Sequence, residues 1–226
     1  MLDNLFRRAF RIIDASGIPE DEWAFGGGTV VALRFRHRES VDVDVFLSDA
    51  QLLTLLSPRL NEEAAAMTGD YVEMPHFVKL RFPEGEIDFI IAPCLTEICR
   101  ERGTFVNREA WVETPEEVVI KKLFYRAESL KVRDVLDVAV VYREREGPLL
   151  EQASLLAPRL AAIERRWEKL RENFHLEIRG LKVLDSSLAA EAPALFEAFV
   201  RDCKKLLQAG RRPRPETSTR SRKQRL

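Results

Sequence analysis

Three consecutive glycines, Gly26-Gly27-Gly28, stand between two segments with different periodicities. Before them Trp23 to Phe25 is typical of a short strand, and after them residues 29–35 have the apolar pattern of a short helix. Glycine has no Cβ, so a ligand can approach the backbone of this turn closely, and the N–H groups of the following helix point toward an anion. The feature predicts a sheet with packed helices and an anion site at the turn.

A second strand with two acidic residues follows the glycine turn. Val41, Val43 and Val45 alternate with Asp42 and Asp44, which is the period of a β-strand. Residues two apart on a strand point to the same face, with Cα atoms about 6.6 Å apart, so the two carboxylates repel each other. Magnesium binds one or two carboxylates together with substrate phosphates. The pattern therefore predicts a site where a metal ion and a triphosphate meet.

A third acidic residue, Asp88, lies among apolar residues in a later strand. The sequence predicts strands at His76–Phe82 and Glu86–Ala92, and the Pro83-Glu-Gly85 turn joins them as a hairpin. An acid in an apolar run needs a partner. We interpret Asp88 either as a paired strand residue, or as a metal ligand or general base in the same cleft as the two earlier acids.

The two halves of the chain differ in pattern. An amphipathic helix opens the sequence and stops near Gly17, and Thr114 with Pro115 begins a region in which helical periods continue to about residue 208. We predict an α+β fold, with a mixed sheet and flanking helices followed by a helical C-terminal half. The expected divisions are a catalytic domain, a helical domain that completes the cleft, and a disordered basic tail, at residues 1–113, 114–210 and 211–226.

The first of these motifs resembles that of the AbiEii/AbiGii toxin family, which belongs to the polymerase-β-like nucleotidyltransferase superfamily. The resemblance covers residues 24–142, and its first motif consists of Gly27, Gly28, Thr29, Leu33, Arg38, Ser40, Asp42, Asp44 and Phe46. It implies a nucleotidyltransferase-type sheet and transfer of a nucleoside monophosphate from an NTP with two Mg²⁺ ions, or Mn²⁺ in their place. It further implies a toxin whose acceptor is RNA, in particular the end of a tRNA, and a cognate antitoxin protein.

The helical half carries further residues that resemble the family's motifs, namely Glu117, Lys122, Arg133, Asp134 and Asp137. We expect residues 116–130 to form one helix, on which Lys122 and Arg126 lie one turn apart and away from the apolar face. Lys121 lies off that stripe, so Lys122 is the preferred phosphate ligand, although the choice between the two lysines stays open.

Several of the predicted substrate contacts have two interpretations. Asp134 and Asp137 either contact substrate or form a salt-bridge network with Arg126 or Arg133. Arg38 and Ser40 either hold phosphate oxygens or orient Asp42. The predicted site therefore has Asp42, Asp44 and Asp88 as catalytic and metal-binding residues. Its predicted substrate-binding residues are Gly27, Gly28, Thr29, Arg38, Ser40, Lys122, Arg126, Asp134 and Asp137.

The composition limits the classes of protein to which the chain can belong. The chain has 226 residues, 46% hydrophobic, which is enough to bury a core. No apolar run is long enough to span a bilayer and the first residues are charged, so we expect a cytoplasmic protein that does not bind a membrane. The three cysteines are too irregularly spaced for a zinc cluster, so we expect free thiols and no disulfide. The three histidines are assigned no chemistry.

The net charge of the chain is −1, but positive and negative charges are unevenly distributed along it. Residues 211–226 carry seven Lys/Arg and one acid, a local charge of +6, which leaves −7 on the remaining 210 residues. The basic tail is interpreted either as a solvated end or as a salt-sensitive anchor for nucleic acid. The acidic body keeps a small-molecule acceptor, such as an aminoglycoside, as an alternative. A non-catalytic homologue that binds nucleotide is a second alternative, which the presence of all three acids disfavours.

Overall fold

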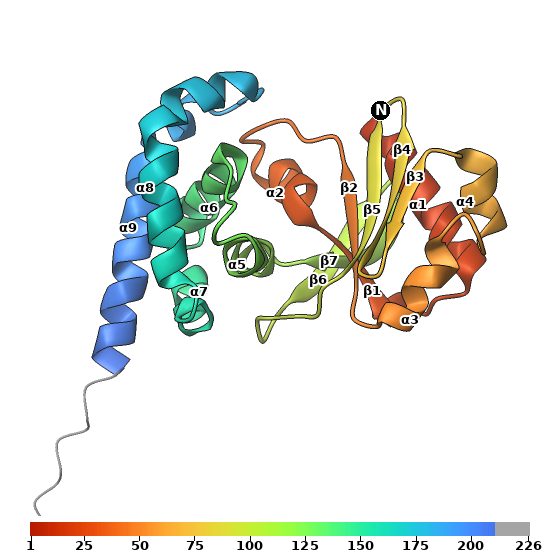
Figure 1. Ribbon diagram of the computed structural model, residues 1–226, viewed down its shortest axis with the longest axis horizontal. Helices are drawn as coiled ribbons and strands as arrows, with labels where there is room; N and C mark the ends of the chain where they lie inside the picture. The colour runs from red at the N-terminus through yellow and green to blue at the C-terminus, as the bar shows by residue number, and fades with distance from the viewer. Residues whose placement is uncertain (211–226) are drawn as a thin grey trace, which may run out of the picture.

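The computed structural model describes residues 1–210, and the predicted tail at 211–226 lies outside the described residues. A seven-stranded mixed sheet forms one half of the molecule and helices form the other (Figure 1). The α+β fold class predicted from the sequence is therefore confirmed.

The strands are β1 (Trp23–Gly26), β2 (Val43–Leu47), β3 (Tyr71–Met74), β4 (Phe77–Phe82), β5 (Gly85–Ile91), β6 (Arg100–Phe105) and β7 (Arg108–Glu113). The helices are α1 (Leu2–Ser16), α2 (Gly27–Phe35), α3 (Ala50–Leu53), α4 (Glu62–Met67), α5 (Pro115–Tyr125), α6 (Val132–Glu144), α7 (Glu146–Glu151), α8 (Leu160–Glu177) and α9 (Ser186–Gly210).

The sheet has the strand order β3-β4-β5-β2-β1-β7-β6. β2 pairs in parallel with β5 and antiparallel with β1, so the strand that follows Asp42 lies at the centre of the sheet. The β4–β5 hairpin forms as the Pro83-Glu-Gly85 turn predicted. Strands β3, β6 and β7 were not predicted, because their sequences contain charged residues without clear alternation.

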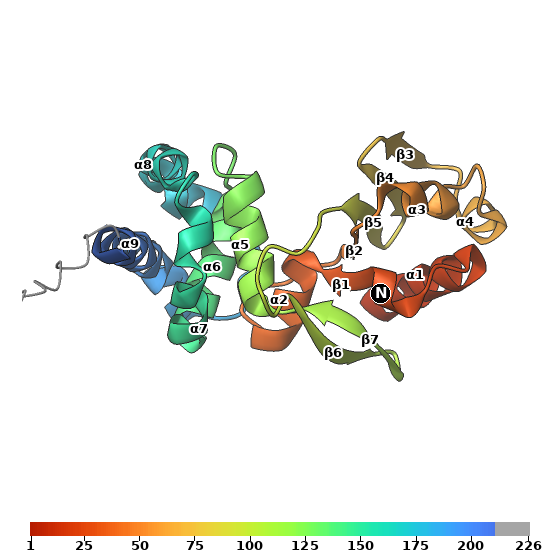
Figure 2. The same cartoon turned by 90° about the horizontal axis from the view of Figure 1, so that it is seen from below.

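Helices cover both faces of the sheet. α1, α3 and α4 lie on one face, and α2 with α5 lies on the other, next to the helical half (Figures 1 and 2). α1 ends where the sequence predicted, because Gly17 adopts a left-handed backbone with φ 70°. α5 begins as predicted, since the Thr114 side chain accepts a hydrogen bond from the Glu117 N–H.

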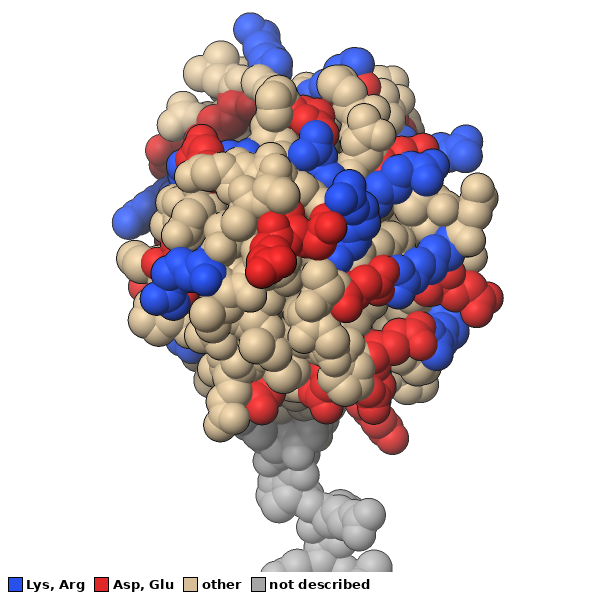
Figure 3. Space-filling view, turned by 90° about the vertical axis from the view of Figure 1, so that its right-hand side faces the viewer, with Lys and Arg blue, Asp and Glu red and all other residues tan. Residues whose placement is uncertain are grey.

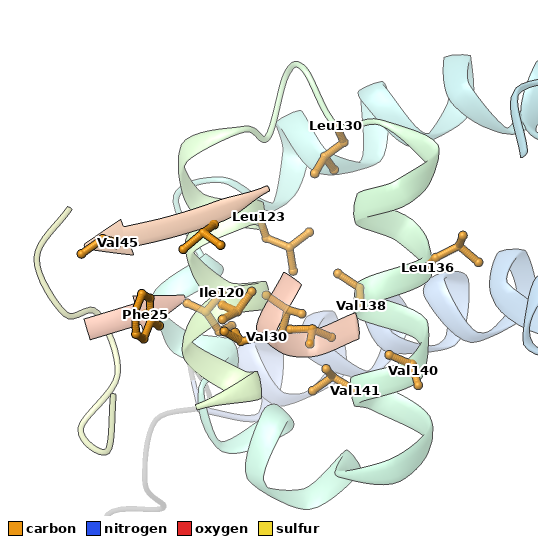
Figure 4. Packing of buried hydrophobic residues seen from close by; sticks show 14 of the residues in the cluster. Phe25, Val30, Val45, Ile120, Leu123, Leu130, Leu136, Val138, Val140 and Val141 are labelled. Carbon is orange, nitrogen blue, oxygen red and sulfur yellow. The ribbon is translucent and has the colours of Figure 1, made fainter. Parts of the chain in front are cut away.

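The hydrophobic core runs without a break from the sheet into the helical half. Figure 4 shows Phe25 and Val45 from the central strands, Val30 from α2 and Ile120 from α5 in one cluster with Val138 from α6. α9 packs along α6 on its far side (Figures 1 and 2). The helical half is thus fixed against the sheet by burial of apolar surface, which stabilises their relative placement.

The outer face of the sheet half carries both signs of charge. In Figure 3, which looks at the side covered by α1, α3 and α4, basic and acidic side chains are interspersed and neither sign dominates. Ion pairs such as Arg11–Glu63 and Arg59–Glu73 account for part of this mixing. This face therefore has no single-sign surface for long-range attraction of a nucleic acid.

One predicted helix boundary is wrong. The expected helix over 116–130 ends at Tyr125, because the chain turns through residues 126–131 to bury Ala127 and Leu130. Arg126 caps the C-terminal end of α5, and its N–H donates to the Lys122 carbonyl at 2.9 Å, so the two residues lie one helical turn apart as predicted. Within residues 1–210, no helix has the length and apolar character needed to cross a membrane.

The cysteine prediction is also wrong. Cys94 and Cys99 form a disulfide with Cα atoms 5.7 Å apart, while Cys203 is a buried free thiol. The loop between β5 and β6 folds back because Leu95 N and Thr96 N donate to the carboxylate of Glu117, 2.9 and 2.8 Å away. That turn brings two cysteines of irregular spacing together, which the sequence spacing alone did not indicate.

Candidate active site

One cavity of about 560 Å³ lies where the central strands meet α2 and α5. Ten of the twelve residues predicted for the site line it: Gly27, Gly28, Thr29, Arg38, Ser40, Asp42, Asp44, Asp88, Lys122 and Arg126. Asp134 and Asp137 do not line it, because they are fully buried behind Lys122. The volume is typical of a site for a small organic ligand.

Two of the acids are direct neighbours on parallel strands. Asp44 of β2 is paired in register with Asp88 of β5. Burial, and next the nearby charge of Asp88, raises the pKa of Asp44 to about 6. Burial also raises the pKa of Asp88, against the opposing effect of Lys79. Two adjacent carboxylates that resist ionisation indicate a place where a cation would be bound favourably.

Asp42 is placed differently from the prediction, because β2 begins at Val43 rather than Val41. Its Oδ1 accepts a hydrogen bond from Glu86 N at 3.2 Å, at the start of β5. Asp42 still lines the cavity with the other two acids. The structure thus brings all three carboxylates to one cavity, while their catalytic roles stay predictions.

The acidic residues suit a magnesium ion whose remaining ligands come from a bound substrate. Among residues 1–210 no group of three His, Cys, Asp or Glu side chains is arranged to enclose a metal ion by itself. Mg²⁺ prefers one or two carboxylates, water and substrate phosphates over an all-protein cage. The Asp44–Asp88 pair meets that requirement, and Oδ1 of Asp88 is buried without a hydrogen-bond partner.

The glycine turn is shaped around these acids. Gly27 has φ +72°, and a Cβ built on it would lie 1.8 Å from Oδ2 of Asp44. A Cβ on Gly26 would lie 2.2 Å from Oε2 of Glu113. Only glycine leaves room for both carboxylates, so the turn presents the N-terminus of α2 next to Asp44.

Thr29 and Ser40 have a structural connection. The Thr29 hydroxyl donates to the backbone carbonyl of Asp42 and lies 2.8 Å from Ser40 Oγ. These contacts fix α2 to the segment that leads into β2, and both side chains border the cavity. A direct substrate contact from either residue stays a prediction.

A buried ionic network lies behind the cavity and is centred on Asp137. Its two carboxylate oxygens accept from Arg38 Nε at 2.7 Å and Nη2 at 2.9 Å. His37 Nε2 lies 2.7 Å from Oδ1, and Lys122 forms an ion pair with Oδ2. Burial alone would raise the pKa of Asp137, but the charges of Lys122 and Arg38 outweigh it and hold the pKa well below its usual range.

This network bears on the interpretations of these residues, whose contacts with substrate stay predictions. Asp137 and Asp134 form salt bridges, but chiefly with Lys122 and Arg38; Arg126 joins only at 3.6 Å from Asp134. Arg38 thus pairs with Asp137 rather than Asp42, and because it also lines the cavity, a phosphate contact from Arg38 stays a prediction. Asp134 Oδ2 also accepts from the Lys131 N–H and caps α6.

The two lysines of α5 point to different parts of the cavity wall. Lys121 Nζ lies 2.5 Å from Glu113 and donates to the Ala92 carbonyl at 2.9 Å. Lys122 Nζ approaches the glycine turn, since a Cβ on Gly28 would lie 3.3 Å from it. Lys122 is thus the lysine nearer to the helix N-terminus where we predict phosphate.

Sequence reasoning missed several residues of the cavity wall. Glu113 is buried, which raises its pKa to about 7 against the effect of Lys121. The sequence feature that could have indicated Glu113 is its position immediately before Thr114, the N-cap residue of α5. The other missed residues are His76, Lys79, Glu86, Ile90, Ile91, Ala92, Val118 and Tyr125. Phe46 and Arg133 were named as motif residues without a predicted role in the site, and Lys121 was the alternative to Lys122. His76 borders the cavity, whereas His37 is a buried partner of Asp137.

Comparison with known proteins gives the following matches. The family model described as nucleotidyl transferase AbiEii toxin, type IV TA system, matches residues 12–218. No curated protein sequence matches the chain. The nucleotidyltransferase toxin MenT4 from Mycobacterium tuberculosis H37Rv aligns with a TM-score of 0.53 at 16% identity, over 89% of this chain and 83% of that chain.

The fold also resembles that of an antibiotic-resistance factor. The solution structure of ANT(2'')-Ia aligns with a TM-score of 0.51 at 14% identity, over 77% of this chain and 97% of that chain. Its crystal structure in complex with adenylyl-2''-tobramycin gives a TM-score of 0.51 at 15% identity, over 72% of this chain and 97% of that chain. At these identities the structural matches show a shared fold.

Proposed function

The chain belongs to the AbiEii family of nucleotidyl transferase toxins, and from this premise we propose that it transfers a nucleoside monophosphate from an NTP to RNA. The proposed acceptor is a hydroxyl of an RNA, in particular the end of a tRNA. The observation that carries the proposal is the paired Asp44 and Asp88 beside the N-terminus of α2 in one cavity. A helix N-terminus attracts phosphate, and adjacent carboxylates attract a divalent cation.

The reaction forms one bond and breaks one. The acceptor hydroxyl oxygen attacks the α-phosphorus in line, the α–β phosphoanhydride bond breaks, and pyrophosphate leaves with the bonding electron pair. Asp88 takes the hydroxyl proton, a role favoured by the raised pKa of its buried carboxyl. Mg²⁺, or Mn²⁺ in its place, held by Asp42, Asp44 and Asp88, would neutralise charge on the phosphates.

Residues of this chain position the triphosphate. The backbone N–H groups at Gly28 and Thr29 and the side chain of Lys122 face the β and γ phosphates, with Arg126 at the cavity mouth. Asp134 and Asp137 hold Lys122 in place from behind, and Arg38 pairs with Asp137 in the same ionic network. Binding and orientation thus come from groups fixed before substrate arrives.

The test is incubation of the protein with each α-labelled NTP, Mg²⁺ and total RNA, followed by gel separation of the RNA. Wild type should label an RNA band, Asp44→Asn should not, and addition of EDTA should abolish labelling. Asp70→Asn is a matched control, because Asp70 is exposed and lies outside the cavity lining. Labelling by Asp44→Asn at the wild-type rate would overturn the proposal.

A small-molecule acceptor is the second candidate, favoured by the charge of −7 on residues 1–210, which suits a cationic acceptor. A parallel reaction with an aminoglycoside in place of RNA separates the two candidates. Labelled aminoglycoside without labelled RNA would select this alternative. No transfer to either, with NTP still bound, would select a non-catalytic homologue.

The family description also favours a protein partner. A type IV toxin–antitoxin system includes an antitoxin, so we expect a cognate antitoxin to counter this activity. The proposed substrates, NTP and tRNA, are found in the cytoplasm, where we place the protein.

A further inference from the structure

Tyr125 is an unusual residue of the cavity wall. It is the last residue of α5 and is 52% exposed. Among the Phe, Trp and Tyr side chains of residues 1–209 it is the only exposed one, since all others are buried or half-buried. An aromatic ring left in water at the mouth of a cavity indicates a surface that is covered when a ligand binds.

The neighbours of Tyr125 are cationic. Lys122 precedes it by three residues and so lies on the same side of α5, and Arg126 and Arg133 also line the cavity. Arg126 is 47% exposed at its side chain. A ligand that contacts both the ring and these side chains must combine negative charge with a flat or apolar part.

The ring is supported from behind. Phe124 contacts Tyr125 edge to face, with centroids 5.2 Å apart, and the Arg159 guanidinium lies 4.9 Å from the centroid of Phe124. These contacts restrict the position of the ring while leaving it half exposed. An aromatic side chain held in this way loses little conformational entropy when a planar group stacks on it.

We propose that Tyr125 is the platform on which the nucleobase of the bound nucleotide stacks. The inference rests on the proposed function, because it takes the triphosphate to lie at Gly28 and Lys122. A base is joined to its phosphates through one ribose, and Tyr125 lies one helical turn from Lys122. Every base has a π-face, so the contact gives affinity for all four NTPs.

The test compares nucleotide with a base-free analogue. Affinities of MgATP and of magnesium tripolyphosphate are measured by calorimetry for wild type, Tyr125→Ala and Tyr125→Phe. Loss of one stacked base should weaken MgATP about tenfold in Tyr125→Ala and leave tripolyphosphate unchanged. Tyr125→Phe should bind MgATP within about twofold of wild type, because the aromatic face is retained.

The matched control is Leu176→Ala, which shortens a side chain that is also 52% exposed but lies outside the cavity lining. It should leave both affinities unchanged. Unchanged MgATP affinity in Tyr125→Ala, or an equal loss for MgATP and tripolyphosphate, would overturn the stacking role. A loss confined to binding of an RNA oligonucleotide would also overturn it, and would assign the ring to the acceptor.

Failure of the proposed function has a different signature. Lys122→Met should weaken MgATP and tripolyphosphate alike, since it removes a phosphate contact. If wild type binds neither ligand, the triphosphate site itself is wrong and the stacking role falls with it. If Lys122→Met behaves as expected and Tyr125→Ala matches wild type, only the stacking role is wrong.

Discussion

Lys79 Nζ lies 2.9 Å from Oδ2 of Asp88, directly across the β4–β5 ladder. Lys79 also forms an ion pair with Glu86, and both of its partners line the cavity. The lysine thus supplies a positive charge next to Asp88, while Lys122 and Arg126 supply the positive charges that act on Asp44. The Lys79 ammonium group offsets part of the cost of burying Asp88 next to Asp44.

Lys79→Met should destabilise the metal-free protein by about 1–2 kcal/mol, because Asp88 loses the charge that compensates it. Thermal unfolding in EDTA measures the loss. Saturating Mg²⁺ with a non-hydrolysable NTP should reduce the difference from wild type. Lys204→Met, which removes an exposed lysine paired with Glu164, should change stability by less than about 0.5 kcal/mol. Equal effects of the two substitutions would contradict the charge argument.

Asp44→Asn should keep the fold, remove transfer activity and stabilise the metal-free protein above about pH 6. The pKa of Asp44 is about 6 in the folded protein against an ordinary value of 3.8, mainly because of burial and then Asp88. The folded state therefore holds the proton more tightly, and this stability is present below about pH 4 and lost as pH rises through 6. The difference of about two pH units corresponds to about 3 kcal/mol at most.

Urea denaturation of Asp44→Asn and wild type in EDTA, at pH 5 and pH 7.5, measures this contribution. The gain in stability should be larger at pH 7.5. A variant that is markedly less stable than wild type and still transfers nucleotide would contradict both the charge repulsion and the catalytic role.

Gly27→Ala should destabilise the protein by at least about 1–2 kcal/mol, because the backbone has φ +72° and the new Cβ would collide with Asp44. In an Asp44→Ala background the steric part should shrink, because the carboxylate atoms at 1.8 and 2.5 Å are removed while the Cβ of residue 44 stays 2.8 Å away. A double-mutant cycle by chemical denaturation measures this coupling. Gly147→Ala is the control, since no atom lies within 4 Å of its Cβ position. Absence of coupling would show that the turn does not pack on Asp44.

Asp137→Asn should cost about 3–5 kcal/mol, because it leaves Arg38 and Lys122 buried without their shared counter-charge. Urea denaturation gives the change in the free energy of unfolding. Glu164→Gln, which breaks an exposed pair with Lys204, should cost less than about 1 kcal/mol. A loss for Asp137→Asn no larger than that of Glu164→Gln would contradict the role of Asp137 as the centre of the network.

Removal of residues 211–226 should lower any RNA affinity and flatten its salt dependence, because seven cationic side chains are deleted. NTP affinity should be unchanged. RNA binding of the full and shortened chains across salt concentrations is the measurement, with NTP binding as control. Equal affinity and equal salt slope would assign the tail no part in binding and strengthen the small-molecule alternative.

The sequence predicted those parts of the fold in which local pattern and tertiary structure agree. The alternation around Asp44, the apolar run around Asp88 and the Thr114 cap each have a local signal that the structure retains. β6 and β7 had no such signal, because residues such as Arg102 and Trp111 are held by cross-strand contacts that only the fold creates.

Part of the cavity wall could be predicted because local motifs carry its residues. Gly27, Asp42 and Asp44 stand close together in the sequence, whereas Glu113 and Lys79 reach the cavity through pairing of distant strands. The Cys94–Cys99 disulfide was missed because it depends on the turn that Glu117 holds. Long-range contacts of this kind leave no periodicity to detect.

The segment that leads to Asp42 and Asp44 is joined to a part of the chain made much later. His37 O accepts from Leu184 N at 2.9 Å, Glu39 N donates to Lys182 O at 2.8 Å, and Arg38 forms a β-bridge with Val183. During synthesis, residues 37–39 can therefore form these bonds only after about 140 further residues have left the ribosome. A nascent chain arrested before Lys182 lacks this support, so the backbone that leads to Asp42 and Asp44 gains these contacts only after residues 182–184 have been made.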